Sequence, residues 1–270
     1  MSQYQRDYYD SHYSTRGALL RAQLTHPLFS SFYSRLARRV LDHGAVQLGE
    51  AVAAGMRPLR VLELGCGEGL LAAALARVAS EAGAEIAYTG SDISASALDL
   101  ARRAAPGEFV VGDASDVAAG LQLGGFDLVV VKNLLHHLSN PAEFLRRASA
   151  LLAPGGRLVA AEASRGSPQA WFFSVLAPRR ERYFFVYGKA RTRRFFGEAG
   201  YRLIRVEPFS FLPYELFFAI RPGVFRRLVN PGKRQTVCGV DALDDRLTRL
   251  LPALCSYRIW VGSPTGGRAR

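Results

Sequence analysis

The sequence predicts an α/β fold built on a doubly wound parallel sheet. Between residues 60 and 163, short apolar segments of strand length alternate with segments of helical composition. A glycine-rich turn at residues 65–69 separates the first strand of this region from the first helix. The first three predicted strands each carry an acidic residue at or near their carboxyl end. Strands that alternate with helices in this way form parallel sheets with right-handed crossovers, and the strand ends meet at one edge.

The first predicted strand, residues 60–64, is apolar except for Arg60 and Glu63. It leads into three alternate glycines: Gly65, Gly67 and Gly69. Glycine is needed where the backbone turns sharply or lies against a ligand, so this loop is expected to form a ligand cradle. Cys66 lies within the loop, where its backbone matters more than its thiol. An acid that precedes the glycines would repel a pyrophosphate and attract an ammonium group.

Two further predicted strands end in acids. Asp92 closes the strand at residues 87–92, and Asp113 closes the strand at residues 109–113. A carboxylate at the tip of the second strand can accept hydrogen bonds from ribose hydroxyls. The later predicted strands are residues 127–131, 157–162, 201–206 and 257–262.

Helices are expected before and between these strands. Four apolar residues recur at intervals of four after Pro27 and predict a helix with one apolar face: Leu28, Phe32, Leu36 and Val40. Pro141 favours a helix start, and Gly200 favours a helix end. The other helices are expected near residues 68–80, 94–104, 141–152 and 192–199.

These motifs resemble the class I S-adenosylmethionine-dependent methyltransferases. The order Glu-x-Gly-x-Gly-x-Gly at residues 63–69 matches the first motif of that family, and Leu-x-Pro-Gly-Gly at residues 152–156 matches its turn into the fifth strand. The resemblance implies a Rossmann-like sheet of seven strands, the last one antiparallel, with helical cap insertions. It also implies S-adenosylmethionine as cofactor and S-adenosylhomocysteine as product. The cofactor-binding residues expected on this basis are Glu63, Gly65, Cys66, Gly67, Gly69, Asp92, Ile93, Asp113, Ala114, Asn133, Tyr8 and Tyr13.

The chain divides into five expected parts. These are an N-terminal lid and helix (1–45), a cofactor-binding core (46–163), two substrate cap insertions (164–200 and 207–254), and the closing strands of the same domain (201–206 and 255–263). The tyrosine-rich residues 1–13 are interpreted either as a disordered tail or as a lid over the cofactor, where an aromatic face would favour a sulfonium. The aromatic residues and arginines of the caps either pack against the sheet or line a pocket for an amphipathic acceptor.

Composition and charge narrow the function classes. The 270 residues contain no apolar run of about 18 residues, and the polar N-terminus is unlike a signal peptide, so a cytoplasmic protein is expected. The three cysteines lack the spacing of a zinc site or a disulfide framework.

The positive charge of the chain lies in its C-terminal part. Residues 1–163 hold 15 basic and 16 acidic side chains, whereas residues 164–270 hold 20 basic and 7 acidic side chains, so the net charge of +12 divides into −1 and +13. This excess is either a solvated basic face or a surface for an anionic substrate, carrier or membrane.

The candidate catalytic residues follow the fourth strand. A hydroxyl acceptor must lose a proton during in-line methyl transfer, and histidine is an efficient base near neutral pH. His136 or His137 is the predicted base with Glu162 in support, although a packed turn of hydrogen-bonded imidazoles is the alternative. Small-molecule O-methyltransferases with a Leu-His-His run resemble this segment and use it as the base.

A divalent metal is not expected at this segment. Ubiquinone-pathway O-methyltransferases have Glu-x-x-Glu-His at this place, with a metal role for those residues. Here Asn133 and His136 replace the two glutamates and only His137 matches. No metal ligands are therefore predicted.

The predicted function is O-methylation of a small amphipathic acceptor, acidic or carrier-linked, in natural-product or lipid-like metabolism. C- or N-methylation of a small molecule remains an alternative. An RNA or DNA methyltransferase is a second alternative, but the fourth strand does not end in Asn/Asp-Pro-Pro-Tyr/Phe and no Pro-Cys nucleophile is present, so nucleic acid is not the expected partner. A non-catalytic cofactor-binding scaffold is a third, against which Glu63, Asp92 and Asp113 argue.

Overall fold

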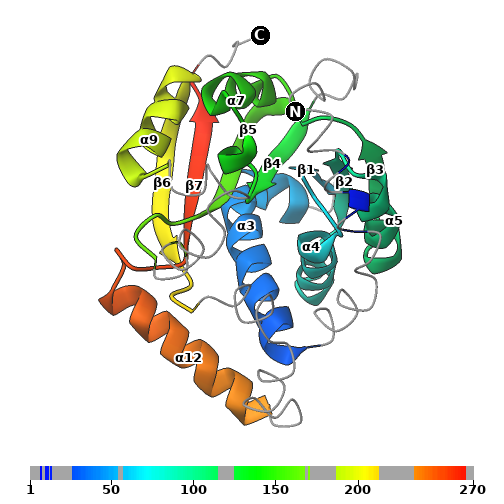
Figure 1. The fold of residues 1–270 in the computed structure, drawn as a ribbon. Coiled ribbons are helices and arrows are strands. Elements are labelled where there is room, and N and C mark those ends of the chain that lie inside the picture. Colours follow the sequence, from blue (N-terminus) through cyan, green and yellow to red (C-terminus); the bar gives the residue numbers. More distant parts are fainter. Residues whose placement is uncertain are drawn as a thin grey trace.

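The computed structural model describes residues 7, 10, 11, 13, 26–53, 57–114, 125–167, 170, 187–212 and 234–265. Within these ranges a seven-stranded sheet has the order β3-β2-β1-β4-β5-β7-β6, with β7 antiparallel to both of its neighbours (Figure 1). The prediction of a doubly wound α/β sheet with an antiparallel last strand is confirmed. The strands are β1 (Leu59–Leu64), β2 (Ile86–Asp92), β3 (Glu108–Val111), β4 (Phe126–Lys132), β5 (Leu152–Ala163), β6 (Tyr201–Phe209) and β7 (Tyr257–Pro264).

Helices cover both faces of the sheet, as Figure 1 shows. One face packs against α3 (Pro27–Ala53), α4 (Leu70–Glu81) and α5 (Ala95–Ala104), and the other against α7 (Pro141–Ser149) and α9 (Lys189–Glu198). Neighbouring residues of a central strand therefore enter different cores: Val61 lies in the first and Leu62 in the second. This explains why the central strands are apolar along most of their length.

Several element boundaries differ from the predicted ones. The strand β5 begins at Leu152 rather than at residue 157, and β6 runs to Phe209 rather than ending at residue 206. The helix α7 ends at Ser149 because Leu152 already pairs with Phe126 at the start of β5. The helix α9 begins at Lys189 rather than near residue 192, directly after the extended Gly188. The strand β3 ends at Val111, so Asp113 lies in the loop beyond the strand rather than at its tip.

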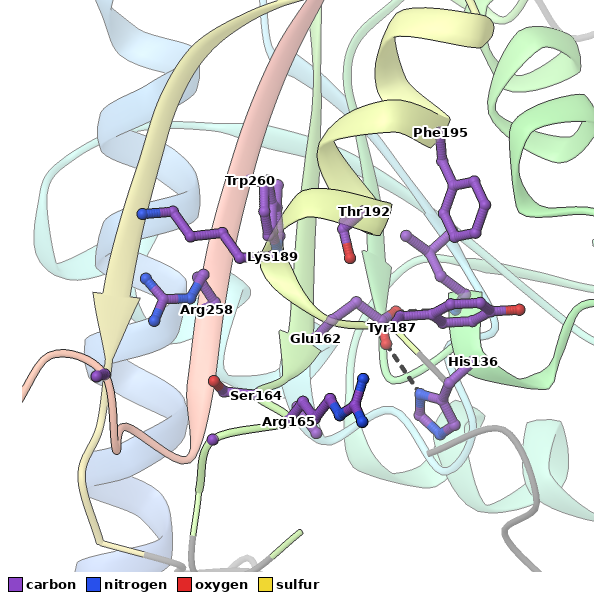
Figure 2. A pocket seen from close by; sticks show the side chains of 14 residues that line it. His136, Glu162, Ser164, Arg165, Tyr187, Lys189, Thr192, Phe195, Arg258 and Trp260 are labelled. Atoms are coloured by element: carbon purple, nitrogen blue, oxygen red, sulfur yellow. Dashed lines mark hydrogen bonds and ion pairs between the residues drawn. The ribbon is translucent and has the colours of Figure 1, made fainter. Parts of the chain in front are cut away.

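The register of the parallel strands brings their carboxyl ends to one edge. Glu63 in β1 lies opposite Gly90 in β2 and Val130 in β4. The ends of these three strands are therefore level with one another. A cavity opens at the same edge, where β5 ends beside the start of β7 and the first turn of α9 (Figure 2).

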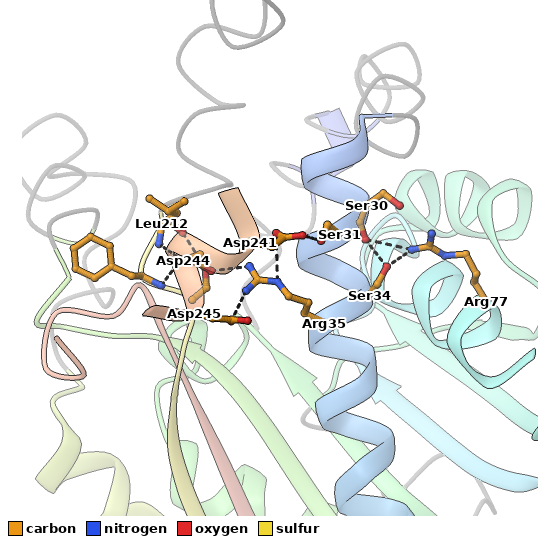
Figure 3. A network of polar contacts seen from close by, with 11 residues as sticks. Ser30, Ser31, Ser34, Arg35, Arg77, Leu212, Asp241, Asp244 and Asp245 are labelled. Carbon is orange, nitrogen blue, oxygen red and sulfur yellow. Dashed lines mark hydrogen bonds and ion pairs between the residues drawn. The ribbon is translucent and has the colours of Figure 1, made fainter. Parts of the chain in front are cut away.

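The helix α12 (Arg234–Leu250) lies in the second predicted cap and is joined to α3 by a charged network (Figure 3). The guanidinium of Arg35 lies 2.6 Å from Asp244, 2.8 Å from Asp245 and 3.7 Å from Asp241. Asp244 is fully buried and also accepts the backbone N–H groups of Phe211 and Leu212, at 2.8 and 2.7 Å. One carboxylate thus joins α12 to α3 and to the end of β6.

We predict that Asp244→Ala lowers the free energy of unfolding by about 3–5 kcal/mol, since it leaves a half-buried arginine and two amides without this acceptor. The matched control is Asp245→Ala, which removes a carboxylate that is 59% exposed from the same arginine and should cost about 0–1 kcal/mol. Urea titration of both variants measures the difference. Equal losses in the two variants would contradict the role of Asp244.

Candidate functional site

The glycine-rich loop between β1 and α4 is held by backbone contacts. Gly65, Gly67 and Gly69 all have left-handed backbone, with φ of 76°, 52° and 77°. The N–H groups of Gly65 and Cys66 donate to the carbonyl oxygen of Ser91, at 2.7 and 3.0 Å. The loop is therefore tied to the end of β2.

One of these glycines has no room for a side chain, and a second lies against a tyrosine. A Cβ at Gly69 would lie 2.9 Å from the backbone of Ala101 in α5, which cannot move aside easily. A Cβ at Gly67 would lie 3.2 Å from the hydroxyl oxygen of Tyr13. Tyr13, predicted to cover the cofactor, therefore lies beside the glycine loop, whereas Tyr8 lies outside the described residues.

Glu63 is a buried acid below the loop. Its side chain accepts a hydrogen bond of 2.6 Å from the hydroxyl of Tyr88, and the residue is 2% exposed. Burial raises the pKa of Glu63 to about 7, against the opposing effects of the Tyr88 hydrogen bond and the charge of Lys132. The site thus contains a carboxylate whose ionised form would be stabilised by a cationic ligand group.

Asp92 organises the tip of β2. Its carboxylate accepts the N–H groups of Gly67 at 2.8 Å and Ser94 at 3.0 Å, while burial raises its pKa. The hydroxyl of Ser94 donates in turn to Asp10, at 2.6 Å. Asp10 and Tyr13 together place the described part of the N-terminal segment against the loop and the tip of β2.

The remaining predicted cofactor residues lie around this edge. Ile93 and Ala114 are buried, and Asp113 is partly exposed beyond β3. Burial raises the pKa of the Cys66 thiol well above its ordinary value, so the thiol stays protonated at neutral pH. Asn133 has a left-handed φ of 51° and donates from Nδ2 to the hydroxyl of Tyr257 at 3.0 Å.

His136 and Glu162 form a buried hydrogen-bonded pair. The Nδ1 atom of His136 lies 2.9 Å from Oε2 of Glu162. The other carboxylate oxygen accepts the N–H groups of Leu134 and Leu135, at 2.9 and 2.8 Å. Because an ionised carboxylate only accepts, the pair favours the tautomer with the proton on Nδ1 and the lone pair on Nε2.

His137 has a different environment. Its ring centroid lies 4.1 Å from that of His136 in the 3₁₀ helix η1 (Leu135–His137). Burial, together with the charge that His136 can carry, lowers the pKa of His137 well below its ordinary value of 6.5. His137 is therefore neutral at physiological pH, and it is not among the residues that line the cavity.

The cavity beside this pair has a volume of about 240 Å³. His136 and Glu162 form part of its wall, together with residues from β7 and α9 (Figure 2). Aromatic, hydroxyl and cationic side chains complete it: Tyr187, Phe195, Trp260, Ser164, Thr192, Arg165, Lys189 and Arg258.

One short segment connects the glycine loop to the cavity. A Cβ at Gly65 would lie 3.1 Å from the side chain of Leu134, so this leucine packs directly over the loop. The next two residues, Leu135 and His136, line the cavity. A ligand on the loop and a molecule in the cavity would therefore be neighbours across this segment.

Comparison with known proteins assigns a domain to part of the chain. Residues 62–160 match the family model of the methyltransferase domain. The strand order around these residues is that of the class I S-adenosylmethionine-dependent methyltransferase fold. The fold of the chain is also that of a SAM-dependent methyltransferase from Archaeoglobus fulgidus, with a TM-score of 0.51 and 17% identity over 80% of this chain and 91% of that one. The family's methyl donor is S-adenosylmethionine, and its product is S-adenosylhomocysteine.

Sequence relatives of the methyltransferase domain include two ubiquinone biosynthesis O-methyltransferases. The one from Caulobacter sp. is 33% identical over 115 residues, which are 40% of this chain and 42% of the relative. The one from Xanthomonas axonopodis pv. citri is 33% identical over 134 residues, which are 47% and 53% of the two chains. The matched stretch spans about half the length of these curated relatives.

Three residues of the methyltransferase site are not evident from sequence motifs. Tyr88 binds Glu63, Asp10 binds Ser94, and the ammonium of Lys132 lies 5.1 Å from the ring centroid of Tyr33. Only Lys132 could be found from the sequence, because it is the last residue of the mainly apolar strand β4, which ends at the site. The other two depend on contacts between distant segments.

In the described ranges, no group of three or more His, Cys, Asp or Glu side chains is arranged to hold a metal ion. None of the helices in those ranges combines the length and the apolar character that crossing a bilayer requires.

We predict that affinity for S-adenosylhomocysteine decreases as the pH falls below about 7. A proton on Glu63, whose pKa is about 7, competes with the ammonium group of the ligand. Because the pKa of Glu63 is raised from its ordinary value of 4.5, the folded, ligand-free protein binds this proton more tightly than the unfolded chain does. The resulting stabilisation of the fold is fully present below pH 4.5. That contribution is lost as the pH rises through about 7.

Calorimetric titration of wild type and Glu63→Gln over a pH series measures both the affinity and its pH dependence. The variant should bind S-adenosylhomocysteine more weakly than wild type at pH ~8, and its affinity should change less between pH ~6 and ~8. Parallel pH profiles for the two proteins would show that Glu63 is not the titrating group.

Proposed function

We propose that the chain transfers a methyl group from S-adenosylmethionine to an oxygen atom of a small-molecule acceptor, with His136 as general base. The observation that carries this proposal is the His136–Glu162 pair in the wall of the cavity, with His136 two residues after Leu134, which packs over the glycine loop. The distance of 2.9 Å within the pair is that of a well-formed N–H···O hydrogen bond.

The residues of the cradle fit the cofactor. The carboxylate of Glu63 suits an ammonium group, Asp92 suits ribose hydroxyls, and Asp113 suits an adenine amino group. The left-handed glycines let a flat group lie against the backbone. When bound, S-adenosylmethionine supplies an activated methyl group on a sulfonium, and we propose Tyr13, whose hydroxyl lies beside Gly67, as an aromatic neighbour of that cation.

Glu162 sets the chemistry of His136. By accepting from Nδ1, it holds the imidazole in one tautomer and orients the lone pair of Nε2 for a proton from the acceptor hydroxyl. It also stabilises the imidazolium that forms, because the positive ring then lies beside a carboxylate. The burial of both residues keeps water from competing for that proton.

The names of the sequence relatives favour oxygen as the acceptor atom, since those proteins are O-methyltransferases of ubiquinone biosynthesis. We extend this to a small amphipathic acceptor, acidic or carrier-linked, of natural-product or lipid-like metabolism. The basic C-terminal part would then face the acceptor, an anionic carrier or a membrane surface. This part of the proposal rests on the charge of +13 in residues 164–270, which is 20 basic minus 7 acidic side chains.

We predict that His136→Ala lowers kcat by about 10²–10⁴-fold, the usual contribution of a general base, without weakening S-adenosylhomocysteine binding. Glu162→Gln should also lower kcat, because an amide can present the wrong hydrogen-bonding group to Nδ1. Formation of S-adenosylhomocysteine with a panel of phenolic acceptors measures the rates.

The matched control is His137→Ala, which removes a neighbouring imidazole that lies outside the cavity wall. Its kcat should stay within a few-fold of wild type. If His136→Ala keeps the wild-type rate at neutral pH, methyl transfer needs no base there, and a nitrogen or carbon acceptor becomes the better assignment.

A further inference from the structure

The wall of the cavity contains three cationic side chains that the proposed proton transfer does not use. Its cations are Arg165 after β5, Lys189 in the first turn of α9, and Arg258 in β7. Figure 2 shows Lys189 and Arg258 on one side of the view and His136 on the other. Three elements that are separate in sequence thus bring positive charge to one small volume.

These three cations lack a carboxylate partner within the part of the chain that the structure describes. Arg258 is partly buried, donates to the carbonyl oxygen of Pro252 at 2.9 Å, and has a pKa lowered by burial. Elsewhere the chain surrounds partly buried Arg35 with three aspartates, and it pairs Arg57 with Asp127. A partly desolvated guanidinium without a counter-charge is costly, and an anionic ligand would remove that cost.

The one acid in the cavity wall is already engaged. Both oxygens of Glu162 accept hydrogen bonds, from Leu134 and Leu135 on one side and from His136 on the other. Its charge therefore lies at the histidine end of the cavity. An anion would be repelled from that end and attracted to the end with Lys189 and Arg258.

The helix α9 adds to this positive potential. Its N-cap residue, Gly188, provides no side-chain cap, and its first turn contains Lys189 and no acidic residue. The free N–H groups and the dipole of such a turn favour an anion. Lys189 and Thr192 from this turn both line the cavity.

We propose that Arg165, Lys189 and Arg258, together with the N-terminal turn of α9, bind a carboxylate or phosphate group of the methyl acceptor. This inference rests on the proposed function, because it assigns the acceptor class to the same cavity. The bound acid holds the acceptor with its hydroxyl toward His136. A volume of about 240 Å³ is smaller than the ~300–1,000 Å³ of sites for drug-sized ligands, so it suits a compact, single-ring acid.

Binding of para-hydroxybenzoate and of its neutral isostere para-hydroxybenzamide tests the proposal. Both are titrated by NMR into the full-length protein saturated with S-adenosylhomocysteine. The acid should bind at least about tenfold more tightly than the amide. Lys189→Gln and Arg258→Gln should each remove most of that preference while leaving the affinity for the amide unchanged.

The matched control is Arg193→Gln, which removes an exposed cation from the same helix outside the cavity. It should leave both affinities as in wild type. If inorganic phosphate displaces the bound acid, the site also accepts phosphate groups. If phosphate does not displace it, the site is specific for carboxylates. Equal affinity for acid and amide, an equal loss in Arg193→Gln, or no binding of either hydroxybenzoate or phosphate overturns the proposal.

This readout does not depend on turnover. If the preference for the acid over the amide depends on Lys189 but His136→Ala stays fully active, the proposed base is wrong and the acid-binding site is supported. If His136→Ala loses activity but the protein does not prefer the acid, the acid-binding site is wrong and the proposed base is supported. Lys189 is exposed, so its variant tests the site even if Arg258→Gln does not fold.

Discussion

The arrangement of the site depends on the buried carboxylate of Glu162. It stands near the end of β5 and accepts three hydrogen bonds from the segment that follows β4, two from backbone and one from His136. A buried carboxylate without such donors would be costly, so the segment and the strand end stabilise each other. The carboxylate of Glu162 therefore both holds the turn after β4 and sets the tautomer of His136. Glu162 and His136 in turn form part of the cavity wall.

The cofactor side of the site is built mainly from backbone. The glycine loop is held by the carbonyl of Ser91 and by Asp92, and its contacts with Ala101 and Leu134 leave little freedom for it to shift. Binding to a loop that is already formed costs less ordering entropy than binding to one that must fold around its ligand. Since Leu134 packs on the loop and His136 follows two residues later, the two halves of the site are placed by one rigid stretch.

Local spacing in the sequence was sufficient to predict the sheet and the cradle. The acid, the three glycines and the acids after later strands lie within short segments whose geometry is fixed by strand and turn. The choice between His136 and His137 could not be made in this way, because it depends on which ring meets Glu162 across the sheet. The assignment of Tyr8 lies outside the described residues.

The cationic side chains of the cavity wall are harder to predict for the same reason. Arg165 and Arg258 are 93 positions apart (258 − 165), and only the pairing of β5 with β7 brings their segments together. The buried ion pair of Arg35 with Asp244 spans 209 positions. The net charge of +13 in residues 164–270 indicated that this part of the chain is basic. It could not indicate which of its basic residues lie together in the structure.

The strand order has a consequence for how the protein is made. The strand β7 lies between β5 and β6, so β6 joins the sheet only through a strand that is translated after it. During synthesis, β6 and its helix α9 must wait for residues 257–264 to leave the ribosome before they gain their neighbour. Pairings so distant in sequence form slowly. The edge of the sheet that carries the cavity is therefore completed last, and a nascent chain that stops short of β7 leaves the edge of β5 unpaired.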